Sequence, residues 1–189
     1  FTANGTAILA NGGGGSIVSN TITTAVGQTA IVAQSGYTGT ISGNTIKNLF
    51  LSGDTSSPVG LSMSTLTNST VSQNSITSVQ SSSSSVPAGM TLATASTGNV
   101  ITQNTIDGVQ GNVGATGDPV GLSLGTGVTT SSVTRNTIRN VLYLGTGGYG
   151  GRGINIDTGN ASSSLTLANN SVSNIRGDGW STFSSDSIA

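Results

Sequence analysis

The sequence predicts an all-β solenoid, a fold in which short strands wind into stacked coils. Three observations predict it. A nine-residue pattern centred on an asparagine occurs six times, a second short apolar run precedes each copy, and no part of the 189 residues sustains the periodicity of an amphipathic helix. Sequence repeats of about 20 to 50 residues are typical of proteins that stack one small unit on the next.

Each copy of the nine-residue pattern places a branched apolar residue three positions before an Asn. A Ser or Thr follows the Asn, and Ile or Val comes next, as in Val133-Thr-Arg-Asn136-Thr-Ile138. Successive copies are 24, 30, 30, 32 and 34 residues apart. The pattern is constant while the spacing varies, so we expect the variable loops to lie between the end of one unit and the start of the next.

The first strand of each unit is predicted from an apolar pair at adjacent or alternating positions. The pairs begin at Ile8, Ile31, Leu61, Met90, Leu122 and Ile154. Period-two alternation over such short runs favours strands. All three prolines of the chain lie three residues before a pair, at Pro58, Pro87 and Pro119. Proline lacks a backbone donor and is best tolerated just before a strand begins, so the prolines support the same register.

The second strand ends at the Asn of the pattern, and the third begins directly after it. Equivalent residues of stacked coils lie about 4.8 Å apart, a distance over which Asn side chains can hydrogen-bond along the stack. We therefore predict a ladder formed by Asn20, Asn44, Asn74, Asn104, Asn136 and Asn170. The same register places Asp107 and Arg139 on neighbouring coils, where they can form an ion pair.

Composition excludes several classes of function. Only 6% of residues are charged, the net charge is -1, and the chain has no Cys and no His. Few cations argue against nucleic-acid binding, and no apolar run approaches the about 20 residues of a membrane-spanning helix. The missing Cys and His remove most ligand sets for a transition metal. We expect no catalytic residue, no metal site, no cofactor and no membrane insertion.

The predicted coil, with three short strands and an Asn at one corner, resembles the right-handed parallel β-helix of the pectin-lyase-like superfamily. The resemblance covers residues 6 to 175 and implies about six coils of three strands, with a partial seventh that starts near Ile188. The run from Gly147 to Ala189 is similar to segments of very large secreted β-helix proteins of Bacteroidota. That likeness implies an extracellular or cell-surface location and a filament or adhesin role.

Residues 1–189 are expected to form a single β-helix domain without obvious end caps. Solenoid ends expose unpaired strand edges. We therefore expect either a fragment of a longer repeat protein or a unit that stacks end to end, with neighbouring repeats of the same chain or of identical chains as its partners.

The leading hypothesis is a non-enzymatic structural or adhesive module. The alternative is a carbohydrate-active β-helix, a polysaccharide lyase or hydrolase, for which Asp157 with Arg152 is the best remaining pair of charged residues. A third hypothesis is a glycan-binding module. Its candidate contacts are Tyr143, Tyr149 and Trp180, whose rings could stack on surface glycans or could instead cover the side of the coil.

Overall fold

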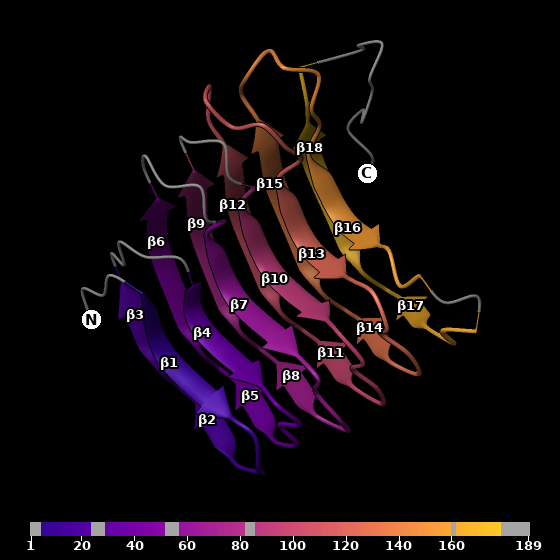
Figure 1. Cartoon of the computed structure of the whole chain (residues 1–189). Helices are drawn as coiled ribbons and strands as arrows, with labels where there is room; N and C mark the ends of the chain where they lie inside the picture. Colours follow the sequence, from indigo (N-terminus) through magenta and orange to yellow (C-terminus); the bar gives the residue numbers. More distant parts are fainter. Residues whose placement is uncertain (1–4, 24–28, 52–56, 82–85, 160–161, 179–189) are drawn as a thin grey trace.

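The computed structural model describes residues 5–23, 29–51, 57–81, 86–159 and 162–178. These residues form three parallel sheets of six strands each, and every coil contributes one strand to each sheet (Figure 1). The predicted all-β solenoid of three-stranded coils is therefore confirmed. The partial seventh coil predicted from Ile188 lies outside the described residues.

The three sheets run along the whole solenoid. The first contains β1 (Thr6–Asn11), β4 (Thr29–Gln34), β7 (Val59–Ser64), β10 (Ala88–Ala93), β13 (Val120–Leu124) and β16 (Arg152–Ile156). The second contains β2 (Ser16–Val18), β5 (Thr40–Ser42), β8 (Thr70–Ser72), β11 (Val100–Thr102), β14 (Ser132–Thr134) and β17 (Thr166–Ala168). The third contains β3 (Thr21–Thr23), β6 (Thr45–Leu51), β9 (Ser75–Ser81), β12 (Thr105–Gly111), β15 (Thr137–Tyr143) and β18 (Ser171–Arg176).

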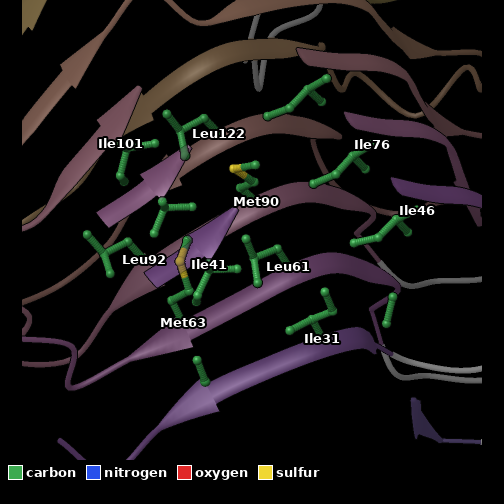
Figure 2. Packing of buried hydrophobic residues seen from close by; sticks show 14 of the residues in the cluster. Ile31, Ile41, Ile46, Leu61, Met63, Ile76, Met90, Leu92, Ile101 and Leu122 are labelled. Carbon is green, nitrogen blue, oxygen red and sulfur yellow. The ribbon is translucent and has the colours of Figure 1, made fainter. Parts of the chain in front are cut away.

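The core consists of apolar residues at equivalent positions of successive coils. In the second sheet Ile41 is in register with Val71, and Val71 with Ile101, and all three are fully buried. Figure 2 shows how side chains of the first sheet, such as Leu61 and Met90, lie alongside those of the third. Each coil thus covers the apolar residues of the coil before it. Because every coil needs a neighbour with matching apolar positions, the same unit is repeated along the chain.

The turn between the second and third strands of each coil has one fixed conformation. The residue before the ladder Asn has a positive φ in every coil, 55° at Gln73, 57° at Gln103 and 56° at Arg135. A residue in the left-handed region turns the chain sharply from one sheet to the next, at a cost for residues other than Gly. This corner places the Asn side chain inside the solenoid.

The third strand bends, which explains the Ile-x-x-Val spacing of the sequence pattern. Residues three apart in a regular strand face opposite sides, yet Ile76 and Val79 are both buried. Ser78 between them has a φ of 61°, and Asn140 has a φ of 57° at the equivalent place. The left-handed residue acts like a β-bulge and returns the next side chain to the core.

Glycine before the first-strand pair is required by a close approach between sheets. A Cβ added to Gly89 would lie 2.4 Å from Cγ2 of Ile106 and 2.6 Å from the carbonyl oxygen of Gly121. Gly60 meets Ile76 and Gly89 in the same way, and Gly121 meets Ile138 and Gly153. The large Ile of the third sheet fills the space that a side chain of the first sheet would need.

Candidate functional site

The Asn ladder is the most regular polar structure in the molecule. Nδ2 of each of the first five ladder asparagines donates to Oδ1 of the Asn in the next coil, at 2.9 to 3.0 Å. The backbone N–H of each donates to the same oxygen at 3.0 Å. All six predicted asparagines take part, so the predicted ladder is confirmed.

The second amide hydrogen of each ladder Asn after the first is bonded to the backbone of the preceding coil. It donates to the carbonyl of the branched apolar residue that opens the preceding copy of the pattern, at 2.8 to 3.0 Å. The interior side chains of Asn44, Asn74, Asn104 and Asn136 therefore donate two hydrogen bonds and accept two. These four hydrogen bonds use the full capacity of a primary amide. They compensate for the free-energy cost of removing the polar side chains from water.

A second and shorter polar stack lies at the corner between the first and second sheets. The backbone N–H of Ser69 donates to Oδ1 of Asn99 at 2.9 Å, and that of Asn99 donates to Oγ of Ser131 at 3.2 Å. All three residues are buried. Sequence reasoning did not identify this stack because its residue type changes from coil to coil. In the described part of the chain every buried side-chain nitrogen and oxygen has a hydrogen-bond partner.

Tyr37 closes the same corner in the second coil. Its ring is buried, and its hydroxyl lies 2.9 Å from the carbonyl oxygen of Gly15 and 3.2 Å from that of Thr40. Burial raises the pKa of the Tyr37 phenol above its ordinary value of 10.0, because a charged phenolate is disfavoured away from water. The residue therefore has a structural role, as a polar link between coils.

The charged side chains form contacts within and between coils. Arg139 and Asp107 form the predicted ion pair across neighbouring coils at 2.9 Å, and Asn140 donates to the other oxygen of the same carboxylate. Arg152 pairs with Asp118 and also donates to Asn155, so it does not form the pair with Asp157 that we considered from sequence. Asp118 lies in a loop 34 residues before Arg152, and the sequence pattern does not specify how that loop returns to the sheet.

Tyr143, the last residue of β15, and Tyr149, in the loop that follows, differ in exposure. Tyr143 is only 3% exposed, and its hydroxyl donates to the carbonyl oxygen of Ala115 and accepts from the N–H of Gly147. The burial of Tyr143 favours the alternative considered from the sequence, in which its ring covers the side of the coil, and the glycan contact at Tyr143 stays a prediction. Tyr149 packs edge-on against Tyr143 with ring centroids 5.5 Å apart and stays partly exposed. Trp180, the third predicted glycan contact, lies outside the described residues.

Among the described residues there is no cluster of three or more metal-ligating side chains. The same residues contain no helix long and apolar enough to cross a membrane.

Comparison with known proteins yields one match. The family described as "Right handed beta helix region" matches residues 6–189, nearly the whole chain. No curated protein and no solved structure matches.

Proposed function

Because this chain belongs to the right-handed β-helix family, whose coils can support either a scaffold or a site, we propose that it is a non-enzymatic structural or adhesive module. The observation that carries the proposal is the saturated Asn ladder. Its side chains, which could otherwise present amides to a ligand, are bonded within the stack and hold the coils in register. A scaffold needs this rigidity along its axis.

The charged groups support the same proposal. Asp107 and Asp118 are held by Arg139 and Arg152, and Asp178 accepts a hydrogen bond from the backbone N–H of Gly148 at 2.5 Å. Glycoside hydrolysis needs two carboxylates that face one substrate bond across roughly 5 to 10 Å, one of them free to exchange a proton. The carboxylates of Asp107, Asp118 and Asp178 are thus committed to arginines or a backbone donor, which suits the fixing of neighbouring coils and loops better than proton transfer.

We place the parent protein outside the cell, as a surface protein or filament of a bacterium. The uncharged Ser, Thr, Asn and Gly surface supports this proposal, and so does the likeness of the run from Gly147 to Ala189 to secreted Bacteroidota proteins. The coil of three strands with an Asn corner supports a place in the pectin-lyase-like superfamily. Residues 1–189 are proposed to act as one domain of such a protein.

Two measurements test the proposal. Antibodies raised against the 189-residue chain should label intact cells of the organism that makes it, and labelling only after permeabilisation would contradict the extracellular role. Incubation of the chain with a panel of acidic and neutral polysaccharides should release neither reducing ends nor unsaturated products. Cleavage of any of them would replace the scaffold with the carbohydrate-active alternative, and retention on an immobilised glycan through Tyr149 would favour the adhesive form.

A further inference from the structure

The outer face of the second sheet is a regular array of small side chains, most of which carry a hydroxyl group. Each strand of this sheet has three residues. The middle one is directed into the core and the two flanking ones are directed outward, as the burial of β5 and β8 shows. Figure 1 shows β5, β8, β11 and β14 side by side along the solenoid.

The strand registers align the outward residues in two columns along the solenoid axis. The first column is Ser16, Thr40, Thr70, Val100, Ser132 and Thr166, and the second is Val18, Ser42, Ser72, Thr102, Thr134 and Ala168. Nine of these twelve residues are Ser or Thr, and the other three are Val or Ala, so the face is both polar and even in height. The sequence does not display the array as one repeat, because Ser, Thr and Val alternate from coil to coil.

The charges of the solenoid lie elsewhere. None of the residues described in the six strands of the second sheet is charged or aromatic. The third sheet, by contrast, carries Lys47, Asp107 and Arg139, and the first carries Arg152. Protein and small-molecule ligands are usually held by aromatic, charged or concave surfaces. The outer face of the second sheet therefore suits a partner that is neutral and rich in hydrogen-bonding groups.

This array is ordered before any partner binds. The Asn ladder lies at one end of the strands, and the stack of Ser69, Asn99 and Ser131 lies at the other. Such side-chain ladders hold a sheet flat against its natural twist. A threonine side chain has a restricted χ1 angle, and Oγ1 of Thr134 donates to Oγ1 of Thr102 at 3.0 Å. Binding to this face therefore costs little side-chain entropy.

The spacing of the array identifies the partner. Equivalent residues of neighbouring strands lie about 4.8 Å apart, and the two outward residues of one strand lie about 6.6 Å apart. These distances are close to the two lattice repeats on the prism face of hexagonal ice, the shorter along the a axis and the longer along the c axis. We propose that the outer face of the second sheet binds ice.

In this contact the hydroxyl groups take hydrogen bonds from, or donate them to, water molecules of the ice surface. Val18 and Val100 have the branched shape of Thr, so their methyl groups continue the same surface. A charged side chain would orient its own hydration water against the lattice, which is why the absence of charge matters as much as the hydroxyl groups. Each contact is weak, and the repetition along the coils makes the binding strong. The inference rests on the adhesive form of the proposed function and names its partner.

Microscopy of a single ice crystal in a solution of the 189-residue chain tests the inference. The crystal should become faceted, and it should resume growth only below its melting temperature, by a gap that widens with protein concentration. Thr70→Tyr places a large ring in the first column, at an exposed strand position where Tyr is tolerated, and should remove most of this gap. Thr91→Tyr is the matched control, because Thr91 lies between Ser62 and Ser123 on the outer side of the first sheet, and it should keep the wild-type gap.

Circular dichroism confirms that both variants remain folded. A wild-type chain that leaves the crystal unshaped, with equal growth and melting temperatures, would overturn the inference without reference to any variant. An equal loss of the gap in both variants would overturn the assigned face. Retention of the chain on crystalline cellulose with no effect on ice would replace ice with a neutral polysaccharide. A chain without effect on ice whose parent protein labels intact cells would leave the proposed function standing and remove only this partner.

Discussion

Replacing Asn104 by Leu removes one interior residue of the Asn ladder while nearly preserving side-chain volume. Asn104 is 1% exposed, and its side chain makes four hydrogen bonds. It accepts from the N–H and Nδ2 of Asn74 at 3.0 and 2.9 Å, and it donates to Asn136 and to the carbonyl of Val71 at 3.0 and 2.9 Å. The backbone N–H of residue 104 still reaches Oδ1 of Asn136 in the variant.

The loss of unfolding free energy in Asn104→Leu follows from the hydrogen-bonding groups that lose their partner. Two buried donors of Asn74 lose their acceptor, at about 1 to 3 kcal/mol each, and the carbonyl of Val71 loses a bond worth about 0.5 to 1.5 kcal/mol. Burial of the leucine side chain returns about 1.5 to 3 kcal/mol. We therefore expect Asn104→Leu to lower the free energy of unfolding by about 2 to 4 kcal/mol.

Urea denaturation followed by circular dichroism measures this loss. Asn11→Leu is the matched control, because Asn11 is exposed and its Oδ1 accepts from the side chains of Gln34 and Ser35, which water can replace. The control should change the free energy of unfolding by less than about 1 kcal/mol. If Asn104→Leu is no more destabilising than Asn11→Leu, the ladder does not stabilise the solenoid and the reasoning fails.

Three further variants test the local geometry. Gly89→Ala should cost about 1 to 3 kcal/mol by overpacking against Ile106, whereas Gly15→Ala, which meets nothing within 4 Å, should be neutral in the same urea titration. Gln103→Gly should raise the thermal midpoint and Gln103→Val should lower it, because residue 103 has a φ of 57°; equal midpoints would contradict the strain. The raised pKa of Tyr37 means that the folded state holds its proton above pH 10.0, where the unfolded state has lost it. The contribution of the protonated Tyr37 to the free energy of unfolding is complete below pH 10.0 and is lost as pH rises through the folded-state pKa. The thermal midpoint of the wild type should therefore fall more steeply above pH 10.0 than that of Tyr37→Phe. Parallel curves would refute this.

The parts of the fold that repeat could be predicted from the sequence, because a repeat reports the same physical constraint six times. The Asn at the corner and the Gly before Leu61, Met90 and Leu122 each mark a place where one residue type satisfies the geometry. The ion pair of Asp107 and Arg139 followed from the register alone.

The parts that occur once could not be predicted in this way. Asp118 reaches Arg152 through a loop whose path depends on its own contacts. Tyr143 is buried because the loop that follows it folds back over its ring, and no periodicity describes that loop. The stack of Ser69, Asn99 and Ser131 uses different side chains for one role, so it lacks a common sequence pattern.

Negative-stain electron microscopy of the native, unfragmented protein tests the central claim most directly, namely that this chain is part of an extended rigid scaffold. We predict stalks or fibres of uniform width that run along the axis of the stacked coils. Compact, separate particles would contradict the scaffold.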